Sequence, residues 1–253
     1  MDNASQAHIR LRNVTLERRV QHEHSLDLKR SLFALLKGAY RPPETQRVLR
    51  DICLNIPVGE RLGIIGSNGA GKSTLLKVIA GILVPTRGEV AVPGVVAPLI
   101  ELGAGFDPDL SVMDNVVTYG VLLGLSREVM LARMDEILAF AELEAQRTTL
   151  VKTLSSGMLA RLGFAVATDV EADVLLIDEV LSVGDERFRK KSQDRIAAFW
   201  ERGITSVIVS HDLHFIAEVC SRVLCMDAGR IAFVGPPKLA VRFYLDVVNA
   251  TGR

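Results

Sequence analysis

The stretch GSNGAGKST, residues 66–74, fits the pattern GxxxxGK[ST] of phosphate-binding loops, with Gly66, Gly71, Lys72 and Ser73 at the fixed places. Glycines let backbone amides turn toward phosphate oxygens, and the N-terminus of a following helix adds positive potential. Lys72 would neutralise the outer phosphates, and the Ser73 hydroxyl would take a position on Mg²⁺. The segment therefore predicts a polyphosphate site rather than an ordinary glycine turn.

A second pattern is VLLIDE, residues 174–179, in which four apolar residues precede two adjacent carboxylates. Ligands of open parallel sheets bind at the carboxyl edge of the strands. There Asp178 would hold Mg²⁺, through water, and Glu179 would orient or deprotonate the attacking water. Taken alone, a strand that ends in Asp-Glu is more often a solvated terminus. The phosphate loop upstream favours the catalytic interpretation.

His211 ends the apolar run SVIVSH, between Ser210 and Asp212. A lone histidine at a strand end is usually structural. At the same sheet edge as the phosphate loop, however, a neutral imidazole could hydrogen-bond the terminal phosphate or the attacking water. We therefore include His211 among the catalytic candidates.

The pentapeptide LSSGM, residues 154–158, precedes a run that looks helical. Ser and Gly at a helix start expose unpaired amides at the positive end of the helix dipole, which makes a second anion-binding terminus. Ser-Ser-Gly is also a common helix N-cap without further function. Taken alone, the pentapeptide is more often only such a cap.

The elements that must position these residues begin with an expected edge strand at residues 7–16 and a second strand near residues 48–56. Between them, residues 17–46 carry an amphipathic run that predicts a short inserted helix. Residues 61–66 form a compact apolar run before the glycine loop, and a helix is expected directly after it. The order strand, tight loop, helix is the one that a phosphate loop requires.

Val-rich pieces within residues 89–102 predict further strands, and residues 107–160 read as a mainly helical lobe. One helix of this lobe is expected to carry a buried stripe of Met130, Met134, Ile137, Leu138 and Ala141. Farther on, the runs 174–178 and 206–211 are separated by a helical stretch. Continuous Val/Ile/Leu runs that alternate with helices predict a parallel sheet covered on both faces. We expect one α/β domain, residues 1–253, with a helical insertion.

Composition narrows the function classes. Thirty Lys and Arg balance thirty Asp and Glu, a net charge of zero without the basic surplus that nucleic-acid binding usually leaves. The longest stretch without charged residues, 115–126, is too short to span a bilayer, and MDNASQAHIR has no secretory pattern. We expect a cytosolic chain with no nucleic-acid partner. Cys53, Cys220 and Cys225 lack metal-site spacing and read as reduced, mostly buried thiols.

In this order, the phosphate loop, LSSGM, VLLIDE, the SVGD turn that ends at Asp185, and His211 resemble the nucleotide-binding subunit of ABC transporters over about residues 48–235. The resemblance implies a P-loop nucleotide-binding domain with a RecA-like parallel-sheet core, an antiparallel β subdomain and a helical insertion. It implies ATP and Mg²⁺ as cofactors. It also implies a head-to-tail homodimer, in which residues 154–158 of one chain close over ATP at the loop of the other.

The resemblance assigns nucleotide contacts to two sets of residues. The set at the loop is Gly66, Ser67, Asn68, Gly69, Ala70, Gly71, Lys72, Ser73 and Thr74. The set that faces the other copy is Leu154, Ser155, Ser156, Gly157, Met158 and Asp185.

Finer features narrow the resemblance. ELGAGFDPDLS at 101–111, the SSGM form and DEVLSVGDERF at 178–188 look like the subfamily that exports cell-surface polysaccharides, namely O-antigens, teichoic acids and capsules. The insertion at 17–46 resembles the O-antigen and teichoic-acid branch. Some members carry a C-terminal carbohydrate-binding domain, which we do not expect in a chain that stops at Arg253. The implied partners are separate membrane permease subunits, reached from the cytoplasmic face through a groove at 103–106, and the lipid-linked polysaccharide would be reached mainly through them.

Two departures from the broader family stand out. Glu101 occupies the place of a glutamine that touches Mg²⁺ and the membrane partner in most relatives, so the resemblance implies a metal contact there that is weaker or differently hydrated. The usual aromatic residue for adenine stacking is missing between residues 14 and 32. Arg18, Arg19 and Tyr40 are the alternatives for that contact.

Three functions are the alternatives to polysaccharide export: an importer ATPase, a non-transport ABC ATPase and a purely structural module. An importer ATPase would share every residue of the ATP site, and only segments 17–46 and 101–111 disfavour it. A non-transport ABC ATPase would need two cassettes or a long coiled coil in the chain, and neither pattern is present. A purely structural module is disfavoured because Lys72, Asp178, Glu179 and His211 are all intact.

Overall fold

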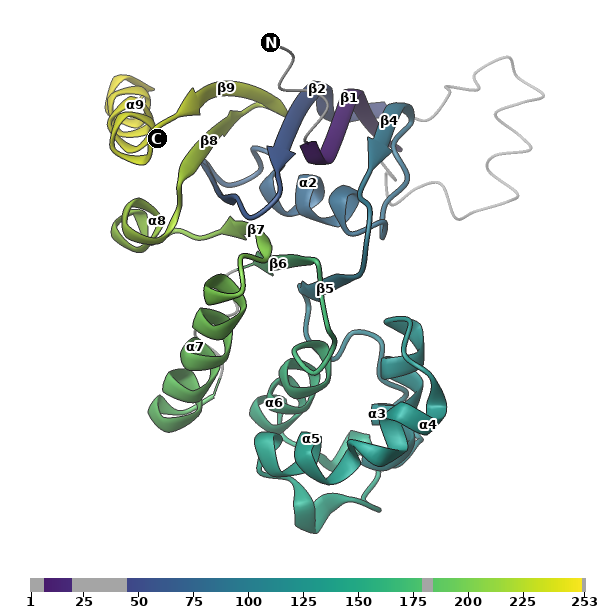
Figure 1. The fold of residues 1–253 in the computed structure, drawn as a ribbon. Helices are drawn as coiled ribbons and strands as arrows, with labels where there is room; N and C mark the ends of the chain where they lie inside the picture. Colours follow the sequence, from purple (N-terminus) through teal and green to yellow (C-terminus); the bar gives the residue numbers. More distant parts are fainter. Residues whose placement is uncertain (1–6, 20–44, 179–183, 252–253) are drawn as a thin grey trace, which may run out of the picture.

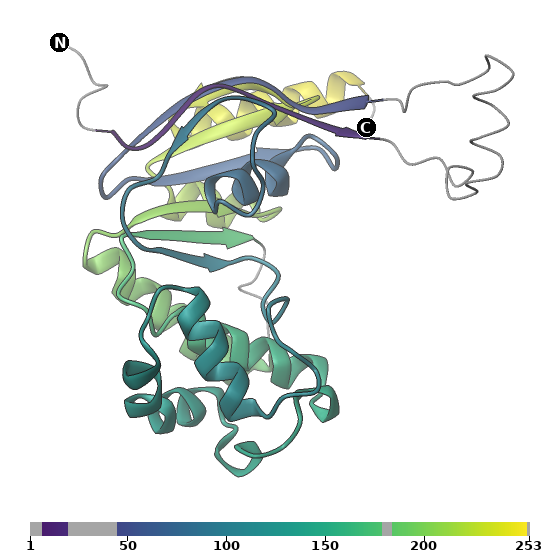
Figure 2. The same cartoon turned by 90° about the vertical axis from the view of Figure 1, so that its right-hand side faces the viewer.

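The computed structural model describes residues 7–19, 45–178 and 184–251 (Figure 1). Two β-sheets lie together in one half of the molecule, and a group of helices lies below them in both views (Figure 2). The sheets contain the phosphate loop, and the helical half contains residues 154–158.

The smaller sheet is antiparallel, with the strand order β2-β1-β4. Its strands are β1 (Ala7–Arg19), β2 (Thr45–Pro57) and β4 (Arg87–Ala91). The expectation of an edge strand at residues 7–16 is therefore wrong. Both edges of β1 are paired, since Leu11 faces Leu54 on one side and Val90 on the other.

The larger sheet contains the predicted parallel strands. In spatial order these are β5 (Val96–Leu99), β6 (Val174–Asp178), β7 (Thr205–Val209), β3 (Arg61–Gly66), β8 (Arg222–Asp227) and β9 (Arg230–Gly235). All neighbours pair in parallel except β8 and β9, which form an antiparallel edge. The carboxyl ends of β3, β5, β6 and β7 consequently lie along one edge of the sheet.

The helices around the larger sheet are α2 (Lys72–Ile79), α7 (Glu186–Glu201), α8 (Leu213–Val219) and α9 (Pro237–Thr251). The helical lobe contains α3 (Val112–Leu122), α4 (Arg127–Ala132), α5 (Met134–Ala141), two short 3-10 turns (Glu144–Gln146 and Val151–Thr153) and α6 (Ser156–Ala167). The helix expected after the phosphate loop ends earlier than its apolar run, at Ile79, and Gly81 follows in a left-handed conformation.

The buried stripe of the lobe is confirmed, but it lies on two helices instead of one. Arg133 separates α4 from α5 with φ −95° and ψ 1°. Amide-to-carbonyl bonds four residues apart continue across the break, from Arg133 to Val129 and from Ile137 to Arg133. The two helices therefore keep nearly the same phase, and Met130 and Met134 are both fully buried.

Two apolar clusters cover the two faces of the larger sheet, as the sequence predicts. One cluster lies between the sheets, where Leu75 of α2 joins Leu176 and Val207 from the larger sheet. The other joins Leu175 and Ile208, on the opposite face, to the lobe and to α7. Helix α2 is thus buried between two sheets, so its N-terminus has a fixed position (Figure 1).

The inserted segment 17–46 is only partly described. Its first and last residues belong to β1 and β2, where Glu17 is paired with Arg47 and Arg19 with Thr45. The predicted inserted helix lies outside the described residues. Within the described ranges, no helix has the length and apolar character to cross a membrane.

Candidate functional site

The phosphate loop connects β3 to α2 through backbone conformations that require glycine. Gly66 and Gly71 have φ of +153° and +104°. A Cβ on Gly66 would lie 2.4 Å from the carbonyl oxygen of Met226, so the loop also passes too close to β8 for any side chain. The Lys72 ammonium is buried and donates hydrogen bonds to the carbonyl oxygens of Gly66 and Ser67, at 2.8 and 3.0 Å. The loop therefore curls around its own lysine at the positive end of α2.

A cavity of about 500 Å³ opens over this loop. Its lining residues come from the phosphate loop and from the carboxyl ends of the parallel strands, together with one residue of β2. They are Val48, Asn68, Gly69, Gly71, Lys72, Ser73, Thr74, Glu101, Asp178 and His211. The structure thus brings part of the sequence candidates to one place, namely residues of the phosphate loop with Glu101, Asp178 and His211.

The carboxylates reach the cavity from neighbouring strands. Asp178 is the last residue of β6, and Glu101 lies two residues after the end of β5. Glu101 accepts a hydrogen bond from the Lys77 ammonium at 2.5 Å, so its charge is paired with α2. Its role as a metal contact stays a prediction. Lys77 was missed in the sequence because a lysine in a helix carries no motif.

The donor set suits a hard cation that keeps most of its own water. A hydroxyl from Ser73 and a carboxylate from Asp178 are oxygen ligands of the kind that Mg²⁺ prefers. Among the described residues, no group of three or more His, Cys, Asp or Glu side chains could hold a metal ion by itself. Mg²⁺ is typically bound by one or two carboxylates plus the phosphates of a nucleotide, so this sparse set fits it.

Of the two catalytic candidates, His211 lies within the described residues and Glu179 does not. His211 lies two residues after the end of β7, is exposed and lines the cavity. Glu179 directly follows Asp178 in the sequence but lies outside the described residues, together with the rest of 179–183. Its catalytic role stays a prediction.

For the adenine contact, the cavity offers a residue that the sequence analysis did not name. Val48, near the start of β2, is half-buried and lines the cavity. Arg18 is not among the lining residues of the described chain, and Tyr40 lies outside the described ranges. Arg19 is described only by its backbone in β1. Val48 belongs to a strand that passes beside the phosphate loop, since a Cβ on Gly71 would lie 3.1 Å from the Val48 carbonyl oxygen, and no sequence motif marks this approach.

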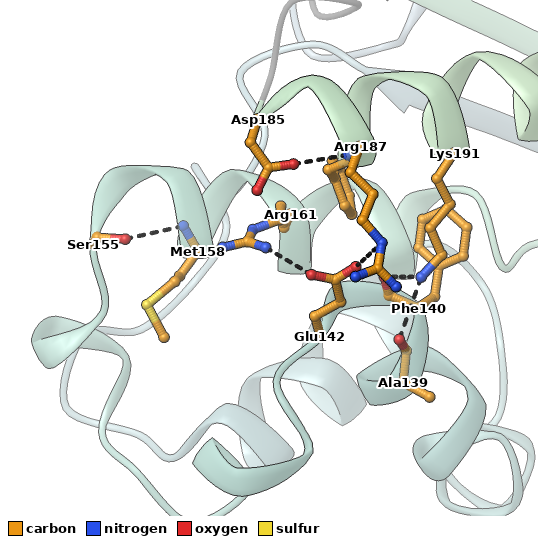
Figure 3. A network of polar contacts seen from close by, with 10 residues as sticks. Ala139, Phe140, Glu142, Ser155, Met158, Arg161, Asp185, Arg187 and Lys191 are labelled. Carbon is orange, nitrogen blue, oxygen red and sulfur yellow. Dashed lines mark hydrogen bonds and ion pairs between the residues drawn. The ribbon is translucent and has the colours of Figure 1, made fainter.

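The LSSGM segment lies apart from this cavity. Ser155 caps α6, where its hydroxyl accepts a hydrogen bond from the amide of Met158 at 3.2 Å (Figure 3). Ser155 and Ser156 are exposed, and a Cβ on Gly157 would meet no described atom within 4 Å. None of residues 154–158 lines the cavity described above. The N-cap geometry is confirmed, and the anion site proposed for it faces open space in this chain.

Asp185, the last residue of the SVGD turn, caps α7. Its carboxylate accepts a hydrogen bond from the amide of Phe188 at 2.9 Å. Asp185 is exposed and, like LSSGM, is not a lining residue of the cavity. LSSGM and Asp185 thus each begin a helix, α6 and α7, and the N-terminal turns of both helices lie on the surface of the chain.

Comparison with known proteins agrees with this geometry. A family model described as ABC transporter matches residues 49–182, more than half of the chain. The O-antigen export system ATP-binding protein RfbB of Myxococcus xanthus is 44% identical over 87% of this chain, which spans only 51% of that protein. A protein of the same name from Klebsiella pneumoniae is 38% identical, with 93% of this chain and 96% of that one covered. The teichoic acids export ATP-binding protein TagH of Bacillus anthracis is 35% identical over 93% of this chain and 42% of its own length.

Solved structures with the same fold include the ATP-binding cassette MJ0796, determined as a dimer in a post-hydrolysis state with ADP and Pi. Its TM-score is 0.70 at 23% identity, and the match covers 90% of this chain and 98% of that one. This likeness confirms the predicted ABC-type P-loop fold. Together with the phosphate loop at the carboxyl edge of the parallel strands, the matches establish that the chain belongs to the ABC transporter family, as one of its ATP-binding chains.

Proposed function

We propose that this chain is the ATP-hydrolysing subunit of an ABC exporter that moves lipid-linked cell-surface polysaccharide across the cytoplasmic membrane. O-antigen lipopolysaccharide is the favoured cargo, with teichoic acid or capsule as alternatives. The observation that carries the ATPase assignment is one cavity lined by the phosphate loop, Asp178 and His211. The names of the relatives, which are O-antigen and teichoic acid export proteins, support the cargo.

In the proposed reaction, backbone amides of the loop and the Lys72 ammonium bind and orient the phosphates of ATP. Ser73 and Asp178 would hold Mg²⁺, which supplies charge neutralisation on the phosphates. Glu179 takes the proton of the attacking water as general base. His211, at the adjacent strand end, hydrogen-bonds the terminal phosphate or that water.

The site is proposed to be completed by a second copy of the chain. Ser155, Ser156 and Gly157 begin α6 at an open surface, away from the loop cavity. A head-to-tail pair would place this positive helix end over the phosphates bound by the other copy. Asp185 would approach the same junction from α7. The dimeric cassette among the structural neighbours is consistent with such a pair.

Closure of the dimer is proposed to move separate permease subunits, which the chain contacts at the cytoplasmic face of the membrane. Segment 103–106 follows Glu101 and contacts the lobe, since Phe106 packs edge-on against Tyr119 with ring centroids 5.2 Å apart. A permease helix bound at this segment would therefore be displaced when either the edge of the cavity or the helical lobe moves. The chain itself is proposed to be a peripheral membrane protein held by these partners.

The proposal is tested by genetic complementation. A strain that lacks the gene for this chain but keeps the genes for the proposed permease should lose surface polysaccharide and accumulate the lipid-linked glycan at the membrane. Wild-type protein should restore export, and the Lys72→Ala variant should not. An Asp135→Asn variant serves as control, because among the described residues that exposed side chain pairs with Arg147 of the helical lobe, at 2.7 Å.

Two outcomes would refute parts of this proposal. Normal surface polysaccharide in the deletion strain, with a defect in uptake of a small solute instead, would favour the importer alternative. Full complementation by Lys72→Ala would contradict the ATPase assignment. Structural analysis of the accumulated glycan separates O-antigen from teichoic acid and capsule.

A further inference from the structure

Glu142, at the C-terminal end of α5, has an unusual backbone conformation. It is the C-cap residue of the helix, and its φ of +59° and ψ of +45° lie in the left-handed region. Glycine or asparagine usually occupies such a position, because a longer side chain is strained there. A strained residue persists where surrounding contacts hold it. The contacts of Glu142 therefore indicate what this position does.

The Glu142 carboxylate touches two helices (Figure 3). Arg161 of α6 donates a hydrogen bond to it at 3.2 Å. The guanidinium of Arg187, in the first turn of α7, lies 4.0 Å from its other oxygen. Arg161 follows Met158 by one helical turn, and Arg187 follows Asp185 by two residues. A single carboxylate thus contacts the second turn of α6 and the first turn of α7, the two helices whose N-terminal turns are proposed to meet the other copy's nucleotide.

The same three helices are also joined at deeper positions. Lys191 of α7 donates a hydrogen bond to the carbonyl oxygen of Phe140, in α5, at 2.8 Å. At the other end of α6, Asp169 is buried between Arg133 and Arg195, at 2.8 and 3.4 Å. These deep contacts fix the lobe to α7 as a unit. Glu142 lies nearer the exposed helix ends than these contacts, and its partner Arg161 also places its guanidinium over the Phe188 ring of α7, 5.8 Å from the ring centroid.

We propose that Glu142 is a positioning residue that holds the LSSGM end of α6 at a fixed spacing from the first turn of α7. This inference rests on the proposed function, because the spacing matters only where both helix ends meet nucleotide bound by a second copy. In the assembled site, Glu142 orders Ser155 through Arg161 and Asp185 through Arg187. It touches neither nucleotide nor water itself, so it acts on closure of the dimer rather than on ATP binding to the loop.

The test compares wild-type, Glu142→Gln and Asp135→Asn proteins, each as the full chain. Glutamine keeps the size of Glu142 and a similar backbone preference but removes its charge. Asp135→Asn breaks a different carboxylate–arginine pair, both partners of which belong to the lobe. We expect Glu142→Gln to lower kcat about fivefold, within the range of substitutions that alter coupling between sites. The protein concentration that gives half-maximal specific activity should rise, and the Kd for ATP should stay within about twofold.

A double substitution separates positioning from general stability. Arg161→Gln should lower kcat at least as much as Glu142→Gln, because Arg161 also contacts the Phe188 ring, and the combined variant should be no worse than Arg161→Gln alone. Thermal unfolding of each protein is measured alongside. A partly exposed ion pair contributes little to folding, so Tm should change no more than in Asp135→Asn. If Glu142→Gln unfolds, Glu142→Asn, which suits the left-handed backbone better, replaces it.

The outcomes are distinct. Wild-type kcat and wild-type concentration dependence in Glu142→Gln would overturn the inference while the proposed function stands. Equal losses of kcat in Glu142→Gln and Asp135→Asn would also overturn it, because the effect would not depend on α7. A wild-type protein that neither binds nor hydrolyses ATP would refute the proposed function and the inference together.

Discussion

The phosphate-loop end and the LSSGM end of this chain are built in opposite ways. At the loop, α2 lies between two sheets, Lys72 is buried, and a Cβ at Gly66 would collide with Met226. At the other end, Ser155 and Ser156 are exposed, and a Cβ at Gly157 would meet nothing. The loop half of the proposed site is packed within a single chain, whereas the LSSGM half is exposed on the surface of that chain.

This difference indicates where each kind of substitution should act. Changes at the loop alter binding of nucleotide by the same chain, because the contacts there are all internal. Changes at residues 154–158 leave that binding intact and affect only what requires a second copy. The following experiments either sharpen this contrast or break it, in order of decreasing expected effect.

The largest effect is expected for Glu179→Gln. Removal of a positioned general base should reduce ATP hydrolysis at least about 100-fold, while ATP binding is retained because the loop is unchanged. Phosphate release and an ATP titration of the same preparation measure the two quantities. Hydrolysis at the wild-type rate would show that Glu179 is not the base.

Lys72→Ala should weaken ATP binding. Loss of a charged hydrogen-bond donor to phosphate costs about 1.5–3 kcal/mol, which raises the Kd roughly 10- to 100-fold. The variant also frees the Gly66 and Ser67 carbonyl oxygens from their lysine partner, so its Tm is measured as a check on folding. An unchanged Kd would contradict the conclusion that the phosphate loop binds ATP through contacts from its own chain.

Ser156→Glu addresses the opposite end. A carboxylate at the start of α6 suits the helix dipole, so the fold should be kept, but it places negative charge where the other copy's phosphates are proposed to lie. The Kd for ATP should stay within about twofold and hydrolysis should fall at least about tenfold.

Mixing the two variants gives the sharpest form of the contrast. A heterodimer of Lys72→Ala and Ser156→Glu chains has one site with both halves intact, so an equimolar mixture should regain about a quarter of wild-type activity if the pair is head-to-tail and its sites are independent. A mixture no more active than its components would break the proposed division of the site between two chains.

Glycine-to-alanine substitutions compare the packing of the phosphate-loop end and the LSSGM end through their effects on the free energy of unfolding. Gly66→Ala should lower the free energy of unfolding by about 2–4 kcal/mol, because the new Cβ overlaps the Met226 oxygen and the backbone is strained. Gly157→Ala should change it by less than about 1 kcal/mol, toward greater stability, since alanine favours the helix. Urea denaturation measures both, and equal effects would contradict the difference in packing.

The smallest effect concerns the thiols. Burial raises the pKa of Cys220 to about 12 and that of Cys225 to about 11, so little thiolate of either exists at pH 8. Cys53 is exposed. A thiol reagent at pH 8 should therefore modify Cys53 alone in the native protein, and the other two should become more reactive as pH rises. Because Cys225 adjoins Met226, faster modification in Gly66→Ala would report loosening of the loop end.

Much of the loop end could be predicted from the sequence. Parallel strands share one carboxyl edge, so apolar runs followed by Gly66, Asp178 and His211 had to converge. The contacts made by Glu142 could not be predicted, because Arg161 and Arg187 come from other elements and no spacing rule connects them. Likewise the central place of β1 depends on β4, which follows only after the phosphate loop and α2.

The pairing of Arg19 with Thr45 has a consequence for how the segment between them can vary. Its two attachment points face each other in the antiparallel pair of β1 and β2, so shortening or replacing residues 20–44 does not require the sheet to move. Loop closure becomes only about 0.6 kcal/mol more costly for each doubling of length. The Arg19–Thr45 pair is thus a point at which the sequence between the two strands can be shortened or replaced while the register of β1 and β2 is kept.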